Sequence, residues 1–504
     1  MFQLHTDKDL SAEKTLAPGL PDHNGVFSVV PQAFPDFQSR LRIAGRWMMA
    51  ADACALLFSY LGGMLLVLTR RTLELGSLPP FLFSLVSLQS FTVFWAIGLT
   101  VILWLDSHGH YRQRLPFWER VGNVLAAASA GFIASGFIEF ASHNISSRLW
   151  IVLCWVLFAV FSMSNRALVR HYLDKAGKWK IPAIVIGEGP TATEAMKLLS
   201  RDKYMGFTIV DQLPPSILSN MKKTHVWKQI LLMHDAQYVF LALEGSDIER
   251  YQKALKSLPR ARVPCSIIPP WLGMPSSTMT PHYFLMQDVM MLHDTNRLKL
   301  PLPRLIKRLV DVTLSSTALL CLLPLFAVVA LIIRRDGGTA FFKQARVGKG
   351  GKLFQCYKFR SMRIDAEEVL KRTLAQDVDA AEEWSKFQKL KNDVRITKFG
   401  AFIRRTSIDE LPQLINVLKG DMSIVGPRPC MEGQEDFYAE DFSCYESVRP
   451  GITGPWQVSG RNQLTFKERV NLEAWYARNW SLWLDIVIML KTVPTLLLKR
   501  DQAF

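Results

Sequence analysis

The feature that most constrains this fold is a set of four apolar runs in the first third of the chain, at residues 47–69, 81–104, 121–141 and 148–165. Each run is close to the roughly 20 residues that a membrane-spanning helix requires. The third run is the weakest, because it carries small residues and Glu139, which a tilted or bundle-facing helix would accommodate. We therefore predict a four-helix transmembrane bundle over residues 46–168.

Basic residues orient the predicted bundle. They cluster before the first run, between the second and third runs, and after the fourth: Arg40, Arg42 and Arg46; Arg112, Arg114 and Arg120; Arg166, Arg170, Lys175, Lys178 and Lys180. Because cytoplasmic loops are enriched in lysine and arginine, both ends of the bundle are predicted to be cytoplasmic. The polar, proline-bearing residues 1–45 are expected to form a mostly disordered or surface-lying arm.

Length, charge and cysteine content narrow the possible functions. A chain of 504 residues is too long for one compact core, so two or more domains are expected. The net charge of +16 favours anionic partners, such as nucleic acid, acidic lipids or phosphorylated substrates. The seven cysteines form no Cys-x-x-Cys pair, so neither a zinc site nor a disulfide framework is predicted.

Residues 179–295 alternate strand-like and helix-like patterns, which predicts a Rossmann-like, doubly wound α/β module. A buried-strand run at residues 180–187 leads into Gly187-Glu188-Gly189-Pro190-Thr191-Ala192, and Asp211 follows near the position of a ribose-binding acid. This G-x-G-x-x-A turn indicates a nucleotide site, but Pro190 is awkward in a turn that cradles phosphate. A regulatory or dimerising module is the alternative.

A fifth apolar run, at residues 309–333, has an unusual charge pattern. Basic residues flank it on both sides: Arg304, Lys307 and Arg308 before it, and Arg334 and Arg335 after it. A helix that crossed the membrane would leave one of these clusters outside, against the charge rule. Pro324 interrupts the run and would kink a helix there. We therefore predict a re-entrant helix-break-helix that enters one leaflet and returns; an ordinary spanning helix is the alternative.

Residues 396–429 carry the chemistry. Asp409 and Glu410 are adjacent, Arg404 lies just upstream, and Arg428 follows within Gly-Pro-Arg-Pro. An anionic nucleophile, an anionic metal ligand and guanidinium groups suit phosphoryl transfer, which mainly requires positioning and neutralisation of phosphate charge. The structural alternative is a capping box, because Ser407-x-x-Glu410 precedes an apolar run. Both interpretations can hold together.

Several motifs in the last 200 residues carry a family resemblance. In chain order they are KFRSM (358–362), RRTSIDELPQLINVLKGDMSIVGPRP (404–429), RPGITG (449–454), WQVSGRN (456–462) and Asp485. This set resembles the bacterial polyprenyl-phosphate hexose-1-phosphate transferases of the large type, which have a single re-entrant helix. The resemblance covers residues 304–504. Two departures are Leu323-Pro324, where small relatives commonly have Ser-Pro, and Pro455, where an apolar or aromatic residue is expected.

The resemblance implies a reaction and a role for each site residue. Asp409 would attack the β-phosphate of a UDP-sugar, release UMP and carry the phosphosugar, which undecaprenyl phosphate would then accept. Glu410 would hold Mg²⁺. The other matching positions are phosphate contacts at Lys358, Arg404 and Arg428, and a supporting acid at Asp485. We expect cations to outweigh the neighbouring charge of Glu410 and keep Asp409 ionised at neutral pH.

The resemblance also implies a fold class, partners and a location. We expect an α plus α/β membrane protein in which residues 304–504 combine the re-entrant helix with a mostly helical interfacial catalytic domain. The expected partners are a UDP-sugar, undecaprenyl phosphate, membrane lipid and a second copy of the chain, but no nucleic acid. The catalytic domain is expected on the cytoplasmic face of the bacterial inner membrane, where the enzyme would initiate O-antigen, capsule or exopolysaccharide synthesis.

Some alternatives remain open at this stage. Galactose is the sugar that the resemblance favours, and glucose is the alternative. A membrane scaffold of polysaccharide assembly is the non-catalytic alternative. A membrane-tethered sugar-nucleotide dehydratase or epimerase is disfavoured, because no tyrosine in this chain has the required lysine four residues later.

Overall fold

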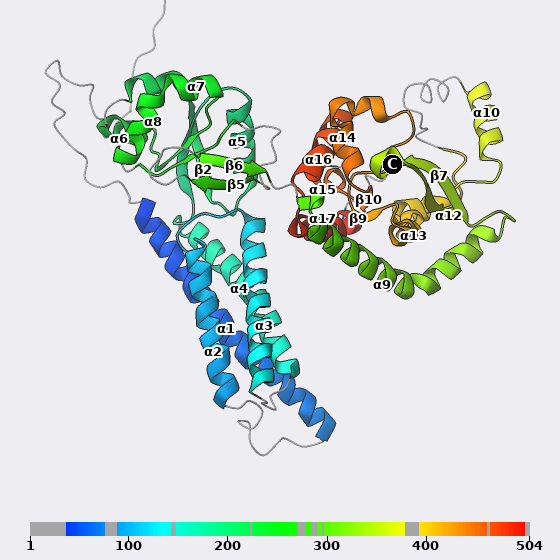
Figure 1. Cartoon of the computed structure of the whole chain (residues 1–504), viewed down its shortest axis with the longest axis horizontal. Coiled ribbons are helices and arrows are strands. Elements are labelled where there is room, and N and C mark those ends of the chain that lie inside the picture. The colour runs from blue at the N-terminus through cyan, green and yellow to red at the C-terminus, as the bar shows by residue number, and fades with distance from the viewer. Residues whose placement is uncertain are drawn as a thin grey trace, which may run out of the picture. The chain divides into compact units, whose positions relative to one another are not determined.

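Figure 1 shows the computed structural model of the chain. It describes residues 37–75, 88–142, 148–221, 224–261, 263–270, 279–283, 290–294, 297–377, 393–460 and 464–498. The chain divides into two compact units, one within residues 1–270 and the other within residues 271–504.

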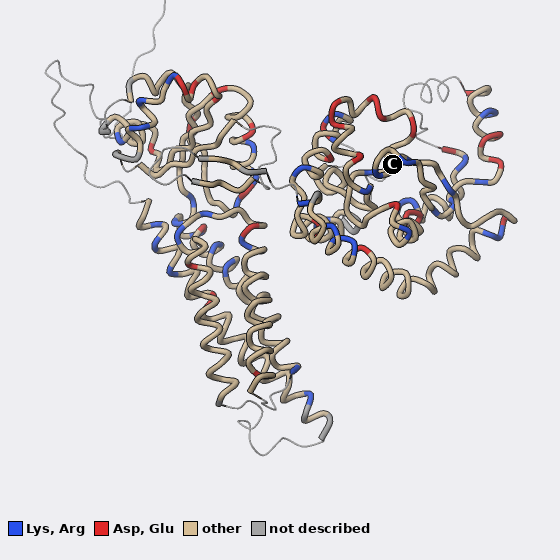
Figure 2. The backbone as a smooth tube through the Cα atoms, in the orientation of Figure 1, with Lys and Arg blue, Asp and Glu red and all other residues tan. Residues whose placement is uncertain are grey.

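The first unit opens with four long helices: α1 (Phe37–Leu75), α2 (Leu88–Ser107), α3 (Phe117–Ala141) and α4 (Arg148–Lys175). They carry the four apolar runs, except that residues 81–87 of the second run lie outside the described residues. Each helix contains a segment long and apolar enough to cross a membrane. Figure 2 shows that charged residues gather mainly at the end of these helices next to the α/β module, which leaves their middle parts apolar. Because α1 begins at Phe37, residues 37–45 of the expected arm are helical. Residues 1–36 lie outside the described part of the chain.

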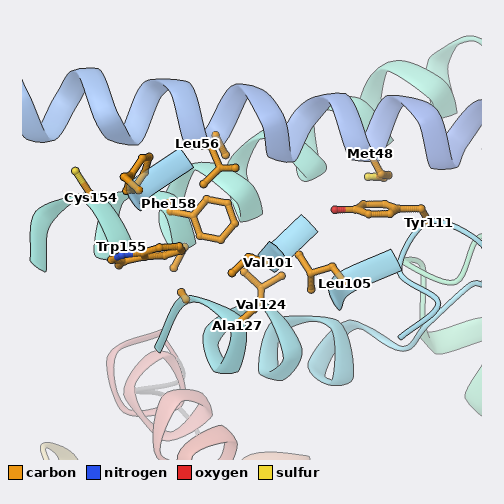
Figure 3. Close-up of a cluster of buried hydrophobic side chains, with 14 of the residues drawn as sticks. Met48, Leu56, Val101, Leu105, Tyr111, Val124, Ala127, Cys154, Trp155 and Phe158 are labelled. Carbon is orange, nitrogen blue, oxygen red and sulfur yellow. The ribbon is translucent and has the colours of Figure 1, made fainter. Parts of the chain in front are cut away.

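The four helices share one core of buried apolar side chains. Figure 3 shows members of this core from each helix: Leu56 (α1), Val101 (α2), Val124 (α3) and Phe158 (α4). Glu139 of α3 is also buried and lines a small cavity with Ser90 of α2 and Trp155 of α4. The third helix therefore turns its polar residue into the bundle, as predicted.

A parallel sheet follows the bundle, with strand order β2-β1-β3-β4. Strands and helices alternate along the chain: β1 (Ile181–Ile186), α5 (Pro190–Arg201), β2 (Phe207–Leu213), η2 (Pro215–Asn220), α6 (Thr224–Met233), β3 (Tyr238–Leu241), α7 (Gly245–Arg250), α8 (Gln252–Ala261) and β4 (Cys265–Ile267). This alternation confirms the predicted α/β module, because parallel neighbours need crossover connections.

A side chain of the module itself occupies the glycine turn after β1. The backbone N–H of Thr191, at the start of α5, donates to Oε1 of Glu244 (3.1 Å). A carboxylate therefore lies where a nucleotide phosphate would meet the N-terminus of the helix. Pro190 is in the first turn of α5, where a proline needs no backbone donor. Asp211 pairs with His234 (Oδ2–Nδ1 2.9 Å). These contacts favour the structural interpretation of the turn over a nucleotide site.

The second unit combines short strands with helices of very different lengths. The described strands form antiparallel pairs β5–β6 and β7–β8 and a parallel pair β9–β10. They are β5 (Met279–Tyr283), β6 (Met290–Asp294), β7 (Phe341–Val347), β8 (Leu353–Phe359), β9 (Ser423–Val425) and β10 (Gly451–Thr453). The α-helices are α9 (Pro301–Arg334), α10 (Ala366–Gln376), α12 (Lys398–Arg405), α13 (Gln413–Lys419), α14 (Phe442–Ser447), α15 (Pro455–Ser459), α16 (Phe466–Arg478) and α17 (Leu482–Leu498). The 3-10 helices are η3 (Arg297–Lys299), η4 (Lys349–Gly351), η5 (Ile408–Glu410), η6 (Glu435–Phe437) and η7 (Ala439–Asp441).

Helix α9 carries the fifth apolar run, and it is also long and apolar enough to cross a membrane. It is one uninterrupted α-helix with Pro324 inside it, so the predicted break is wrong. A proline removes one backbone donor and bends a helix, but the adjacent turns can continue through the bend. Figure 1 shows α9 as a curved helix along one side of the unit.

Both ends of α9 contact the same unit. Near its start, Arg308 donates to the carbonyl oxygens of Val417 (2.6 Å) and Leu418 (2.8 Å). At its end, the carbonyl oxygen of Ile333 accepts from Arg360 (3.1 Å). Asp311, on the first half of α9, accepts from the backbone N–H of Ile424 (3.0 Å). The helix is therefore fastened to the unit at each end of its apolar part.

Candidate active site

A short irregular turn positions the two adjacent acids. Helix α12 begins at a Thr397 cap and ends at Arg405. The chain then reverses through Ser407, whose φ of +58° is in the left-handed region, into the 3-10 helix η5, which contains Asp409 and Glu410. The Ser407 side chain makes no capping hydrogen bond. The capping-box interpretation is therefore wrong, because the residues that follow form a 3-10 turn with a different geometry.

Strand β8 brings a cation to the acid pair. Nζ of Lys358 donates to Oε1 of Glu410 (2.7 Å), and Nη2 of Arg428 lies 4.0 Å from the same oxygen. Burial alone would raise the pKa of Glu410, but the positive charges of Lys358 and Arg428 lower this pKa to about 2. Glu410 is therefore an anion at any physiological pH.

Asp409 is only 9% exposed and titrates much higher than its neighbour. Burial and the charge of Glu410 raise the pKa of Asp409 to about 6, while Lys358 and Arg404 lower it by less. Contrary to our expectation, these cations do not outweigh the raising effects. A carboxyl with a pKa near 6 is nonetheless mostly ionised at pH 7, so Asp409 keeps the charge that a nucleophile needs.

Arg404 approaches the pair from α12. Its Nε donates to Oγ of Ser361 (2.8 Å), in the segment that follows β8. Helix α12 comes very close to this segment at Gly400, where a Cβ atom would lie only 1.9 Å from the carbonyl oxygen of Ser361. Glycine at this position thus allows the approach that places Arg404 near Asp409.

The Gly-Pro-Arg-Pro loop is held by buried side chains. The backbone N–H of Arg428 donates to Oε1 of Glu473 (2.9 Å), and Oε2 of Glu473 accepts from the hydroxyl of Tyr438 (2.7 Å). The carbonyl oxygen of Pro429 accepts from Arg346 (3.1 Å). Hydrogen bonds therefore fix the backbone on both sides of the Arg428 side chain, at its own N–H and at the carbonyl of Pro429.

Two arginines contact one indole ring beside this loop. The guanidinium carbons of Arg428 and Arg469 lie 5.6 Å and 4.7 Å from the ring centre of Trp456. Trp456 follows Pro455, which is the first residue of α15. The proline that departs from the family pattern is thus in the position where helices favour proline.

Asp485 has a different set of partners. This carboxylate is 4% exposed and accepts from Lys307 (2.6 Å), from the hydroxyl of Tyr476 (2.7 Å) and from Nε1 of Trp480 (2.9 Å). Lys307 also donates to the carbonyl oxygen of Val425 (3.1 Å), and this oxygen lies 3.0 Å from the Tyr476 hydroxyl. Val425 directly precedes the Gly-Pro-Arg-Pro loop, so Asp485 connects to the site through the backbone and not through the acid pair.

Sequence reasoning missed three of these positions, namely Lys307, Arg346 and Glu473. Arg346 contributes to the low pKa of Glu410 in addition to binding Pro429. Glu473 had a detectable signal, because it occurs at helical spacing among buried apolar residues of α16, with Val470, Ala474 and Ala477. An acid on such a face needs a partner.

The site fits a magnesium ion that substrate phosphates would complete. Among the described residues, no group of three or more His, Cys, Asp or Glu side chains could hold a metal ion. Mg²⁺, however, commonly binds one or two carboxylates together with phosphate oxygens and water. Asp409 and Glu410 supply such carboxylates beside cations that attract phosphate.

Two families match this chain. Residues 302–499 match the family described as bacterial sugar transferase, and residues 106–269 match the family described as CoA-binding domain. The first match contains the whole set of residues around Asp409 and Glu410, and the second contains the parallel sheet.

Full-length relatives are similar across both units. The chain is 38% identical to the undecaprenyl-phosphate galactose phosphotransferase of Salmonella typhimurium over 404 residues, which cover 78% of this chain and 84% of that protein. It is 36% identical to the UDP-galactose-lipid carrier transferase of Erwinia amylovora over 411 residues, with coverage of 78% and 84%. It is 29% identical to the UDP-glucose:undecaprenyl-phosphate glucose-1-phosphate transferase of Xanthomonas campestris pv. campestris over 409 residues, with coverage of 75% and 79%. The chain therefore belongs to the bacterial sugar transferase family, and it is a membrane-associated sugar phosphotransferase.

Proposed function

We propose that this protein moves a sugar-1-phosphate from a UDP-sugar to undecaprenyl phosphate, and that Asp409 carries the phosphosugar between them. The observation that carries the proposal is the pairing of a buried, mostly ionised Asp409 with Glu410, Lys358 and two arginines. Such a group combines an anionic nucleophile with the cations that a phosphoryl transfer requires.

The reaction consists of two displacements at one phosphorus atom. A carboxylate oxygen of Asp409 bonds to the β-phosphorus, and the bond from this phosphorus to the bridging oxygen breaks, so UMP leaves with that oxygen. An oxygen of the lipid phosphate then bonds to the same phosphorus, and its bond to Asp409 breaks. The products are UMP and undecaprenyl-diphosphate sugar, and the carboxylate is regenerated. Each substrate thus uses the site in turn.

The surrounding residues have separate tasks. Arg428 and Lys358 neutralise the phosphate oxygens, while Arg404 stabilises the charge of Asp409. Glu410 would hold Mg²⁺, which would supply further neutralisation of the diphosphate when bound. The contact between Lys358 and Glu410 keeps a cation beside the acid pair before substrate arrives.

We infer that α9 is re-entrant and not spanning. A straight helix of 34 residues would be about 51 Å long, which exceeds the hydrocarbon thickness of about 30 Å. Both ends of α9, however, bind elements of the same unit, through Arg308 and Ile333. A curved helix with both ends on the cytoplasmic face would hold Asp409 at the boundary where a water-borne donor meets a lipid acceptor.

We propose galactose as the transferred sugar and initiation of O-antigen, capsule or exopolysaccharide synthesis as the role. Support comes from the two relatives named for galactose, which are more similar to this chain than the relative named for glucose. The test is UMP release by the purified full-length protein with undecaprenyl phosphate, Mg²⁺ and either UDP-galactose or UDP-glucose. Release with UDP-glucose alone would overturn the sugar assignment.

The covalent step has its own test. Protein incubated with UDP-sugar labelled in the sugar, without lipid acceptor, should retain label. Asp409→Asn should retain none, whereas Asp436→Asn, which changes an exposed aspartate of the same unit, should behave as wild type. Label on Asp409→Asn would exclude the proposed nucleophile, and intact polysaccharide synthesis in cells with that variant would favour a scaffold.

Metal and assembly complete the proposal. Chelation should stop UMP release, and Mg²⁺ should restore it; full activity in chelator would exclude the metal.

We also propose a homodimer, which the mass of the purified protein in detergent, corrected for bound detergent, would test directly. A monomer mass would exclude it.

A further inference from the structure

The first unit contains a basic cavity that the transfer reaction does not use. It lies where the helical bundle meets the α/β module, between α1, the segment 108–116, α3 and α4. Its polar lining includes His110, Arg114, Arg120, Arg166 and Trp179. Its interior is small, at about 10 Å³, which is room for about one water molecule, and it opens on one side to solvent. Figure 3 places Tyr111 and Met48, which also line it, at one end of the buried apolar core.

The backbone closes this cavity on one side. A Cβ atom at Gly45 of α1 would lie 2.0 Å from the carbonyl oxygen of Tyr111. Only glycine therefore lets the segment 108–116 lie directly on α1. Arg40, one turn earlier, donates to the carbonyl oxygen of Lys180 (2.9 Å), which ties the same helix to the start of the module. The cavity is thus built between fixed elements.

The cavity holds more positive than negative charge. Arg166 forms a buried ion pair with Asp52, and the Asp52 oxygens also accept from the hydroxyls of Tyr111 and Ser162, each at 2.6 Å. The acid is therefore already saturated by its neighbours. Within the described residues, Arg114 and Arg120 form no ion pair, although Asp202 lies near enough to Arg120 to interact electrostatically.

The hydrogen bonds that these two arginines make go to backbone carbonyls. Arg114 donates to Trp179 (3.4 Å), and its guanidinium lies over the indole of Trp179 at 3.7 Å. Arg120 donates to Leu115 (3.1 Å). Neither contact neutralises a charge, so among the described residues Arg114 and Arg120 have no ion-pair partner, and only the longer-range interaction with acids such as Asp202 offsets the charge of Arg120.

The buried polar atoms left without a partner around the cavity are donors. They are Nε2 of His110 and Nε of Arg114, whereas the unpartnered Nε1 of Trp179 lies against Gly206 of the module. The assignment for His110 follows from geometry, because an Arg166 N–H lies 2.9 Å from its Nδ1. Arginine always donates, so Nδ1 must accept and Nε2 must carry the hydrogen. A buried donor without an acceptor lowers the stability of the fold by about 1–3 kcal/mol, so a ligand that supplies an acceptor to these atoms would be favoured.

We propose that the mouth of this cavity, where Arg114 and Arg120 are partly exposed, binds the phosphate group of an anionic ligand. Phosphate supplies several acceptor oxygens and the negative charge that Arg114 and Arg120 lack. Two sources share this chemistry: the headgroup of an anionic phospholipid, since basic pockets between membrane helices bind such headgroups, and a soluble phosphate compound. Occupancy would stiffen the junction between bundle and module.

The experiment measures backbone hydrogen exchange of residues 108–120 in the full-length protein reconstituted in lipid nanodiscs. One arm compares phosphatidylcholine alone with phosphatidylcholine plus phosphatidylglycerol. The other adds inorganic phosphate to phosphatidylcholine nanodiscs at constant ionic strength. Slower exchange only with phosphatidylglycerol identifies a lipid headgroup, and slower exchange with added phosphate identifies a soluble ligand.

Variants separate this site from general attraction of anions. In Arg114→Gln, the concentration of phosphatidylglycerol or phosphate that gives half of the slowing of exchange should rise about tenfold. This is the effect expected for one lost hydrogen bond to a charged group. Arg112→Gln is the matched control, because it removes the same charge from the same segment at a side chain that is 73% exposed and paired with Asp106. It should respond as wild type. Arg114→Lys should recover part of the effect.

Two results would overturn the proposal. One is wild-type exchange that is identical in every arm, which would mean that the cavity holds water only. The other is an equal loss of response in Arg112→Gln and Arg114→Gln. If Arg114→Gln does not fold, Arg120→Gln takes its place, and the wild-type comparison between arms stands without any variant. Because the readout is local to the first unit, failure here leaves the role of Asp409 untouched.

Discussion

The buried carboxylate of Glu473 accepts the backbone N–H of Arg428 at 2.9 Å, which fixes the residue whose guanidinium faces Glu410. Glu473 is 2% exposed, and its second oxygen accepts from Tyr438. Helix α16 therefore fixes the point on the loop from which the Arg428 side chain extends, although no side chain of α16 contacts Asp409 or Glu410.

Replacing Glu473 by alanine should damage both stability and substrate binding. The change leaves the N–H of Arg428 and the hydroxyl of Tyr438 without an acceptor, at about 1–3 kcal/mol each. We expect a clearly lower thermal unfolding midpoint and a raised KM for the UDP-sugar. Glu473→Gln keeps an acceptor for Arg428 and should be much milder, while Glu440→Ala, at an exposed glutamate, should have no effect. Equal behaviour of the Ala and Gln variants would argue against this positioning role.

The pH dependence of stability should also report on Glu473. Burial raises the pKa of Glu473 to about 7, above the ordinary value of 4.5. For an acid with a raised pKa, the folded state binds the proton more tightly, so this stabilisation is complete below pH 4.5 and is lost as pH rises through about 7. The shift corresponds to about 3 kcal/mol. Unfolding midpoints across this range should fall less steeply with pH in Glu473→Gln than in wild type; parallel curves would show that the carboxyl does not titrate there.

The catalytic rate should rise with pH through about 6. Asp409 must be deprotonated to attack phosphorus, and burial with the charge of Glu410 raises its pKa to about 6. Because Lys358 lowers this pKa, Lys358→Met should move the acid limb of the rate profile to higher pH and reduce the rate. Lys352→Met removes an exposed lysine in the connection between β7 and β8 and is the control. An acid limb at the same pH in both variants would contradict the assignment.

Local signals predicted much of this architecture. The described parts of the apolar runs fall within α1–α4 and α9, and the alternation after residue 180 became a parallel sheet. The family resemblance also assigned Lys358 and Glu410, which come from separate segments, to one site, and the structure brings them to 2.7 Å. That success depended on the resemblance, because the pattern itself does not determine which strand faces which turn.

The failures have a common physical cause. Pro324 and Ser407 were each interpreted by a local rule, but the structure continues α9 through the proline and uses Ser407 in a left-handed turn. Neither rule takes account of how the neighbouring turns of the chain continue. Similarly, Glu473 and Arg346 act on a loop that is distant in sequence, so only an acid on a buried helix face indicated one of them.

The ion pair between Lys307 and Asp485 should matter through the backbone that it supports. Asp485→Ala would leave the Lys307 ammonium, the Tyr476 hydroxyl and the Trp480 N–H without their shared acceptor in a buried site. Breaking a buried pair in this way costs about 3–5 kcal/mol, so the thermal unfolding midpoint should fall sharply. The double change Lys307→Met with Asp485→Leu removes both charges, so it should recover the stability lost to the unpaired ammonium, while the Trp480 N–H still lacks its acceptor.

In the double variant, the KM for the UDP-sugar shows whether the ion pair positions the loop of Arg428 or contributes only to folding stability. Lys307→Met also removes the donor to the carbonyl oxygen of Val425, which precedes the loop of Arg428. The double variant should therefore fold stably yet keep a raised KM for the UDP-sugar, whereas Asp436→Ala, at an exposed position, should retain both properties. Wild-type KM in the stable double variant would show that the pair serves folding only and does not position Arg428.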